Sequence, residues 1–251
     1  MARQKSLIKL KGTLDGITFY KSKKGYMARQ STSLDGELVA TDPRFVRTRE
    51  NNAEFGRAGA AGKILRKAFR DQIQLAKDGT VVSRLSKEMM KVLQADKVSA
   101  RGKRNVLDGE LELLRGFNFN SRSPIDTVLF MNYSYEIDRA GGVLGVSFPS
   151  FRTLTSIQAP QGSTHFKIIV GGAAIDFENE NTEVAVSDSG ELALEALTTE
   201  AFTQQVNLSA DSSDPLFLVL GLIFYQEVNG FYYHLSNGVF NSLAIIGVEG
   251  I

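Results

Sequence analysis

The sequence predicts an α+β protein in which an N-terminal β-hairpin and a helical segment precede a C-terminal antiparallel β-sandwich. Three observations support this fold class. A turn near the N-terminus is flanked by strand-like runs, apolar residues recur at helical spacing between about 51 and 115, and many short strand-like runs follow residue 118. With 43% hydrophobic and 23% charged residues over 251 positions, the chain can form one large core or two modest ones.

Residues 1–29 are predicted to form a β-hairpin arm. Apolar and lysine residues alternate over residues 7–11, a turn is expected at Asp15-Gly16, and residues 17–20 return as a strand. An isolated hairpin is only marginally stable in water. We therefore expect the hairpin to pack on its own chain or on a neighbouring copy.

Residues 30–118 are predicted to form a basic helical region. Asn51 and Glu54 have the spacing of a capping box, which predicts that a first helix starts there. A second helix is expected over residues 81–96, and a third over residues 103–115.

The first predicted helix contains an unusual run of small residues. Gly56, Gly59 and Gly62 each weaken a helix by about 1 kcal/mol relative to alanine, so we expect another backbone to approach closely there. The run from Arg57 to Lys63 resembles a phosphate-binding loop, but it lacks the first glycine and no strand leads into it. We favour helix packing over nucleotide binding.

Residues 119–251 are predicted to form an acidic antiparallel β-sandwich domain. Many short strands separated by turns rich in Gly, Asn, Ser and Asp are typical of such a domain. The Asn229-Gly230 pair between two aromatic-rich runs is the clearest hairpin signal in the chain. The expected strands are 127–137, 143–148, 165–170, 183–186, 192–194, 205–208, 217–226, 231–235 and 242–248.

The two halves of the chain carry opposite charge. Residues 1–120 contain 25 Lys and Arg against 13 Asp and Glu, whereas residues 121–251 contain 4 against 15. The net charge of the whole chain is nevertheless only +1. Such a division bears on partners: the basic half can contact the acidic half of another copy, or it can bind a polyanion.

The basic candidates for such contacts fall on the hairpin and on the first helix. The helical ones follow the spacing i, i+3, i+4 and i+7, which places them on one face. A solvated helix surface is the plainer interpretation of one such face, and contact with nucleic-acid phosphates is the functional one. The basic candidates are Lys21, Lys23, Lys24, Lys63, Arg66, Lys67 and Arg70.

The acidic candidates are Asp176, Glu178, Glu180 and Glu183, which share one turn-like stretch. Carboxylates are ligands that calcium accepts, but the EF-hand pattern is absent and a solvated loop is the plainer interpretation. We predict no metal site and no cofactor.

No catalytic residue is predicted, and we expect the protein not to be an enzyme. The chain has no cysteine, and its only two histidines, His165 and His234, lack the short spacing of a metal site. No Gly-x-Ser-x-Gly motif supports a catalytic triad. The aromatic residues near the C-terminus are expected to divide between the core and a contact surface. They are Phe217, Phe224, Tyr225, Phe231, Tyr232, Tyr233 and Phe240.

The N-terminus contains basic residues but no apolar segment of the kind found in secretory signals. The longest apolar stretch, residues 215–225, is too short to span a bilayer. We therefore expect cytoplasmic synthesis, no membrane span, and any release only as part of an assembly.

Four stretches of the chain resemble a family of uncharacterised proteins from Bacteroidota. They are GTLDGITFYK at residues 12–21, TDPRF at 41–45, RTRENNAEFGRAG at 47–59 and FYQEVNG at 224–230. The resemblance covers nearly the whole chain. It implies no activity, cofactor or site residue.

The charge division and the hairpin favour a structural subunit that assembles with other copies of itself into a filament, tube or virion-like particle. The contacts would join the basic N-terminal half of one copy to the acidic C-terminal half of the next. The alternative is a nucleic-acid-binding protein that uses the basic half. A β-sandwich enzyme or carbohydrate binder is a third hypothesis, which no motif supports.

Overall fold

The computed structural model describes residues 2–22, 24–30, 36–195 and 198–250, without the side chains of residues 236 and 237. The chain divides into two compact units, Met1–Arg49 and Glu50–Ile251. We call them the N-terminal unit and the main unit.

The N-terminal unit contains a four-stranded antiparallel sheet in the order β1-β4-β3-β2. The β2–β3 turn is formed by Asp15 and Gly16, which both adopt positive φ (42° and 74°), as a two-residue Asp-Gly hairpin turn requires. The predicted N-terminal hairpin is thus confirmed within a larger sheet. Its strands are β1 (Ala2–Arg3), β2 (Gly12–Leu14), β3 (Ile17–Ser22) and β4 (Gly25–Gln30), followed by α1 (Gly36–Thr41) and η1 (Pro43–Phe45).

The strand expected over residues 7–11 is wrong, because these residues form a loop. The Gln4 side chain closes this loop: its amide nitrogen donates to the Leu10 carbonyl at 3.2 Å, and its amide oxygen accepts from the Leu10 N–H at 2.9 Å. A side chain thereby occupies both backbone groups of Leu10, and the strand begins only at Gly12.

Three helices begin the helical part of the chain: α2 (Val46–Ala68), α3 (Arg70–Leu75) and α4 (Val81–Gln94). The capping box predicted at Asn51 and Glu54 is wrong, since both residues lie inside α2. Asp42 caps the preceding η1 turn by accepting from the Arg44 N–H, and helical structure continues from there into α2.

The predicted second helix is confirmed as α4, which buries Leu85, Met89 and Leu93. The predicted third helix, over residues 103–115, is wrong apart from the short η2 (Leu111–Leu114). The buried Asp96 carboxylate accepts from the N–H groups of Val98, Ser99 and Asn105 at 2.8, 2.9 and 3.1 Å, respectively. These bonds hold the segment as a loop.

The close backbone approach expected at the three glycines of α2 is also wrong. A Cβ atom at Gly56 or Gly59 would have no neighbour within 4 Å among the described atoms. At Gly62 it would touch the side chains of Leu85 and Met89 at 3.6 and 3.7 Å. Only Gly62 is therefore explained by helix packing.

The β part of the main unit contains two antiparallel sheets. The larger has the order β12-β11-β7-β8, with β13 also paired to β11 and β9 to β7, and the smaller has the order β10-β6-β5. The strands are β5 (Ser134–Asp138), β6 (Val143–Phe148), β7 (His165–Asp176), β8 (Asn181–Asp188), β9 (Leu192–Ala193), β10 (Phe202–Asn207), β11 (Leu216–Val228), β12 (Phe231–His234) and β13 (Ser242–Glu249).

Short helical turns complete the main unit: α5 (Ile125–Val128), α6 (Thr153–Ser156) and η3 (Leu235–Gly238). Because α5 occupies the beginning of the strand expected over residues 127–137, β5 starts only at Ser134. The Asn229-Gly230 hairpin is confirmed by the pairing of Val228 with Phe231. Among the described helices, none is long and apolar enough to cross a membrane.

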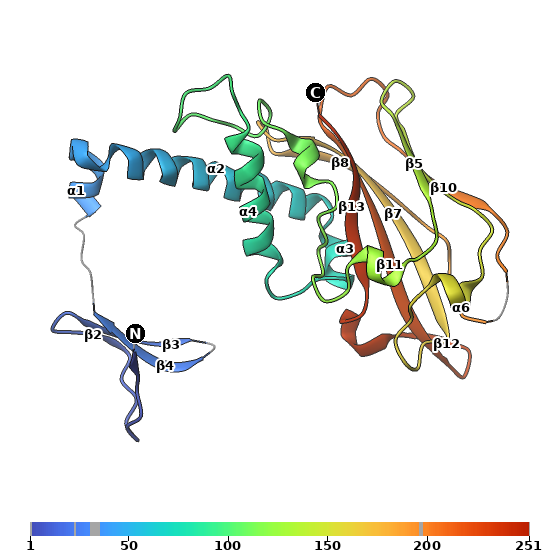
Figure 1. Ribbon diagram of the computed structural model, residues 1–251, viewed down its shortest axis with the longest axis horizontal. Coiled ribbons are helices and arrows are strands. Elements are labelled where there is room, and N and C mark those ends of the chain that lie inside the picture. Colours follow the sequence, from blue (N-terminus) through green and yellow to red (C-terminus); the bar gives the residue numbers. More distant parts are fainter. Residues whose placement is uncertain (1, 23, 31–35, 196–197, 251) are drawn as a thin grey trace. The chain divides into compact units, whose positions relative to one another are not determined.

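The larger sheet lies between the helices and the smaller sheet (Figure 1), and apolar residues pack on both of its faces. Along β11, Phe217, Val219 and Ile223 pack with the helices, whereas the alternate residues Leu218 and Leu220 face the smaller sheet. The α+β class and the antiparallel sandwich predicted from the sequence are confirmed.

Adjacent glycines in β7 allow both layers to approach the larger sheet closely. A Cβ atom at Gly171 would lie 2.9 Å from Val219 and 3.3 Å from the ring of Phe69, which follows α2. A Cβ atom at Gly172 would lie 2.7 Å from Val206 of the smaller sheet. The absence of side chains at Gly171 and Gly172 therefore lets the helices and the smaller sheet pack closely on the larger sheet.

Candidate functional site

The N-terminal unit exposes its apolar residues. None of its described residues is buried. Leu7 is fully exposed and Ile8 is 76% exposed, and Leu10, Leu14 and Ile17 are exposed as well. Exposed apolar residues grouped in this way mark an interaction surface or an aggregation hazard.

The loop that carries Leu7 and Ile8 is internally fixed. Besides the two Gln4–Leu10 hydrogen bonds, the Lys9 ammonium donates to the carbonyls of Gln4, at 2.8 Å, and Ser6. Leu7 and Ile8 thus lie at the tip of a closed loop. We call these two residues the apolar tip.

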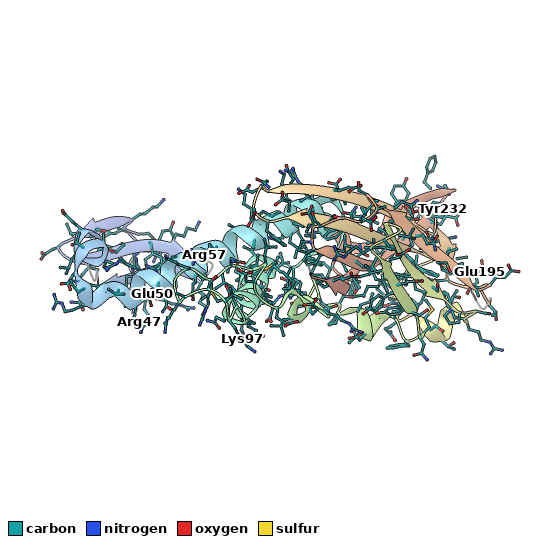
Figure 2. All side chains as sticks on the ribbon, turned by 90° about the horizontal axis from the view of Figure 1, so that it is seen from above. Arg47, Glu50, Arg57, Lys97, Glu195 and Tyr232 are labelled. Atoms are coloured by element: carbon teal, nitrogen blue, oxygen red, sulfur yellow. The ribbon has the colours of Figure 1, made fainter. Side chains whose placement is uncertain are left out.

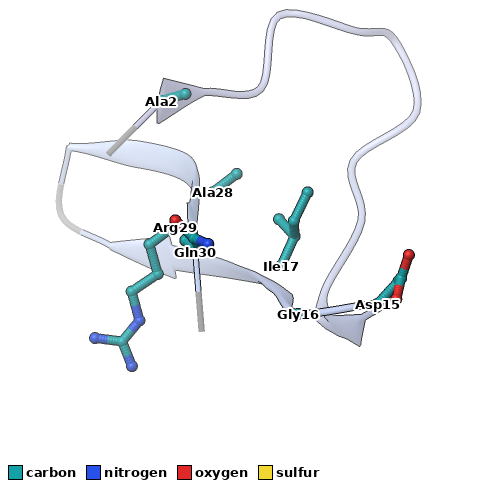
Figure 3. Close-up of a pocket in the computed structure, with 7 residues that line it drawn as sticks. All are labelled: Ala2, Asp15, Gly16, Ile17, Ala28, Arg29 and Gln30. Atoms are coloured by element: carbon teal, nitrogen blue, oxygen red, sulfur yellow. The ribbon is translucent and has the colours of Figure 1, made fainter. Parts of the chain in front are cut away.

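A shallow hollow lies on the sheet of the N-terminal unit (Figure 3). Ala28 and Ile17 point to the same side of the sheet, whereas the Arg29 side chain points away from them. The hollow adds contact surface beside the β2–β3 turn. Its lining residues are Ala2, Asp15, Gly16, Ile17, Ala28, Arg29 and Gln30.

The basic candidates of the hairpin lie at the β3–β4 end. Lys21 and Lys24 are exposed, and the Lys21 ammonium lies 5.7 Å from the centre of the Tyr26 ring. Lys23 lies outside the described residues.

The basic candidates of the helical region share one side of α2 and the start of α3. Lys63, Lys67 and Arg70 are exposed, whereas Arg66 is half-buried and donates from Nε to the Gly62 carbonyl at 3.1 Å. Three of the four cations are therefore available to a partner.

Two of the four acidic candidates have local structural roles. The Asp176 carboxylate accepts from the N–H groups of Glu178 and Asn179, both at 2.9 Å, and hydrogen bonds from Asn179 lower the pKa of Asp176. Glu183 accepts from the N–H of Ser209 at 2.9 Å. Glu178 and Glu180 are exposed. No group of three His, Asp or Glu side chains suited to a metal occurs within the described ranges.

The C-terminal aromatic residues divide between core and surface. Phe217, Phe224 and Tyr225 are buried, while the other four are exposed: Phe231, Tyr232, Tyr233 and Phe240. Phe231, Tyr232 and Tyr233 all belong to β12, a strand at the end of the larger sheet. We call this strand the aromatic edge.

The two histidines lie in one row across three strands. In the register of the sheet, His165 is opposite Tyr225, which is opposite His234 on its other side. The His165 ring lies 4.8 Å from the Tyr232 ring, and its Nε2 lies 3.8 Å from a Glu227 carboxylate oxygen. The sequence spacing of the histidines gives no signal of this proximity, because strand register decides it.

A polar contact between α2 and the loop that follows α4 was also missed from the sequence. Glu54, 2% exposed, accepts from the Gly102 N–H at 2.8 Å, and Arg57 donates to the carbonyls of Gly102 and Arg104. The loop thereby presents the exposed residue Val98. Figure 2 shows Arg57 and Lys97 on this side of the main unit and Tyr232 and Glu195 at its other end.

The described residues thus offer two exposed apolar surfaces that sequence reasoning located only in part, the apolar tip and the aromatic edge. Alternation in β12 made some surface aromatics predictable, but it could not tell which ones. The chain matches no protein-family model, no curated protein sequence and no solved structure.

Proposed function

We propose that this protein is a structural subunit that assembles with copies of itself, with the N-terminal unit as the element that docks on a neighbour. The observation that carries the proposal is the absence of any buried residue among the described residues of that unit. A small sheet with no buried face gains little from the hydrophobic effect, so it needs a partner surface to be stable.

The charge of the two units favours a second copy as that partner. The N-terminal unit contains 11 Lys and Arg against 4 Asp and Glu, and the main unit contains 18 against 24. Opposite charges favour encounter of the two surfaces and fix their orientation. A contact between different surfaces of identical copies is head-to-tail, and it builds rings or open filaments.

Internal contacts occupy two of the four cations after residue 120. Arg139 donates to the Glu249 carboxylate at 2.9 Å and to the carbonyls of Ser212 and Asp214 at 2.6 and 2.8 Å. Lys167 lies 2.9 Å from Glu191. Residues 121–251 contain 15 Asp and Glu against only these four cations, so most of their carboxylates can attract a basic partner.

The test is negative-stain electron microscopy and sedimentation of nuclease-treated protein at low and high salt. We expect filaments, tubes or closed particles, and a mass that rises with protein concentration. The full-length variant Leu7→Glu/Ile8→Glu should remain a monomer of 27.5 kDa, whereas the control Val98→Glu, also on an exposed apolar residue, should assemble normally. A wild-type protein that is monomeric at every salt and protein concentration would contradict the proposal.

Nucleic-acid binding is the second candidate function, favoured by the exposed row of Lys63, Lys67 and Arg70. Contacts to phosphates make affinity fall steeply with salt. If this function operates, Lys63→Glu/Lys67→Glu should weaken binding of single- or double-stranded DNA about tenfold or more, and Leu7→Glu should weaken it much less. Binding that is absent or insensitive to salt would exclude it.

A further inference from the structure

We propose that the aromatic edge β12 is the surface on which the N-terminal unit of a second copy docks, with the apolar tip seated against it. The inference rests on the proposed self-assembly and names its acceptor. It would place Leu7 and Ile8 of one copy against Phe231 and Tyr233 of the next.

The first support is the open edge of the strand. β12 pairs with β11 from Phe231 to His234, and nothing in the described part of the chain pairs with its other side. All four residues of the strand are exposed. A strand edge of this kind presents free N–H and C=O groups, and natural proteins cover or charge such edges unless the edge has a partner.

The second support is the apolar surface beside that edge. Val228 is opposite Phe231 in the register, and Tyr233 lies two residues further along the same face. Phe231 and Tyr233 are 67% and 57% exposed, and Val228 is exposed as well. Aromatic side chains grouped on one face are typical of interface anchors, because they bury large areas with few rotatable bonds.

The third support is charge. Glu227 lies opposite Tyr232 in the register, and Glu195 lies at the same end of the main unit (Figure 2). The nearby cation Lys167 is already paired with Glu191. On the N-terminal unit, the exposed residues Lys5 and Lys11 flank the apolar tip. A basic, apolar tip thus complements an acidic, aromatic edge.

A competing apolar groove on the main unit has the wrong charge. It is lined by Phe55, Val82 and Met90, but also by Lys87 and Lys91. Lys91 is paired with Glu88 at 2.6 Å, but Lys87 repels a basic partner, so the groove is a poorer acceptor for the N-terminal unit than the aromatic edge.

The test combines two full-length variants that each lack one side of the contact. The tip variant is Leu7→Glu/Ile8→Glu, and the edge variant is Phe231→Glu/Tyr233→Glu. All four residues are exposed, so the two monomeric variants should melt within about 2 °C of each other. Each variant alone should sediment as a monomer of 27.5 kDa.

Mixed at equal concentration, the two variants should form a dimer of twice the monomer mass and nothing larger. The edge variant still has a working tip and the tip variant a working edge, so one contact forms and no second can follow. An edge variant that assembles as the wild type does would overturn the acceptor inference while leaving self-assembly intact. A wild type that never assembles would overturn the proposed function itself.

Discussion

The two units of this chain differ in how far their β-sheets are buried. In the main unit the larger sheet is covered on one face by helices and on the other by the smaller sheet, and its central strands are almost wholly buried. In the N-terminal unit the four-stranded sheet has no buried residue among those described, and several of its apolar side chains are exposed. Burial stabilises the first sheet within the chain, whereas the second lacks a comparable source of stability.

We expect stability to depend on the main unit and assembly to depend on the N-terminal unit. Substitutions in the packed core of the main unit should change the free energy of unfolding and leave the docking surface intact. Substitutions in the N-terminal unit should do the reverse.

Phe69→Ala should lower the free energy of unfolding by about 3–5 kcal/mol. The Phe69 side chain is fully buried where the helices meet Gly171 of β7, and its removal leaves a cavity between the two layers. Chemical denaturation followed by circular dichroism measures the loss. A loss below about 1 kcal/mol would mean that the helices and the larger sheet do not share a core.

Asp78→Asn should lower the free energy of unfolding by about 2–3 kcal/mol at pH 7. Asp78 accepts from the N–H groups of Thr80 and Ser121 and pairs with Arg84 at 2.7 Å, which ties residue 121 to the start of α4. Burial alone would raise the pKa of Asp78, but the hydrogen bonds from Ser121 and Thr80 outweigh it and hold the pKa well below its ordinary value.

Asp78 should also make the free energy of unfolding depend on pH in a definite direction. Because the pKa of Asp78 is lower in the folded than in the unfolded state, its stabilisation is complete above the unfolded pKa of about 4 and is lost as the pH falls below it. The difference in unfolding free energy between wild type and Asp78→Asn should therefore shrink below about pH 4. A difference that stays constant from pH 7 to pH 3 would contradict this role.

Much of the main unit was predictable from the sequence, because strands and hairpin turns have local signals. Residues 143–148 were placed without error, and the Asn229-Gly230 turn has positive φ at both positions (53° and 81°). Two of the misplaced elements have in common a side chain that competes for backbone groups: Gln4 at the expected first strand and Asp96 before the expected third helix. Such competition depends on three-dimensional positions that periodicity does not reveal.

The candidate site was less predictable than the fold. Sequence patterns placed the basic face of α2 and located the aromatic runs, but exposure decides which of these residues a partner can reach. Tyr225 and Tyr233 belong to the same hairpin, yet the first is buried and the second exposed. Tyr225 packs with the helices, whereas Tyr233 is opposite Gln226 and so lies on the other face of the sheet. The sequence of the hairpin alone does not say which face is covered.

Gly56→Ala and Gly59→Ala should each raise the free energy of unfolding by about 0.5–1 kcal/mol. Both glycines lie within α2, and the added methyl group would meet no described atom within 4 Å. Thermal unfolding of the monomeric tip variant carrying each substitution measures the gain. A decrease in stability would show that a neighbouring backbone does pack on this surface.

Leu14→Ser should change the free energy of unfolding of the main unit by less than about 0.5 kcal/mol. Leu14 is exposed at the end of β2, so its loss removes little burial within the chain. Denaturation of the tip variant, with and without Leu14→Ser, isolates this effect from assembly. Destabilisation of more than about 1 kcal/mol would mean that the N-terminal unit packs on its own chain.

The most direct test of the central claim is sedimentation velocity of the wild type and the Leu7→Glu/Ile8→Glu variant, side by side over a range of protein concentrations. If the N-terminal unit docks on a neighbouring copy, the wild type will sediment as multiples of 27.5 kDa that grow with concentration, and the variant will remain at 27.5 kDa. If both proteins sediment as the same monomer throughout, or both assemble to the same extent, the N-terminal unit is not the docking element.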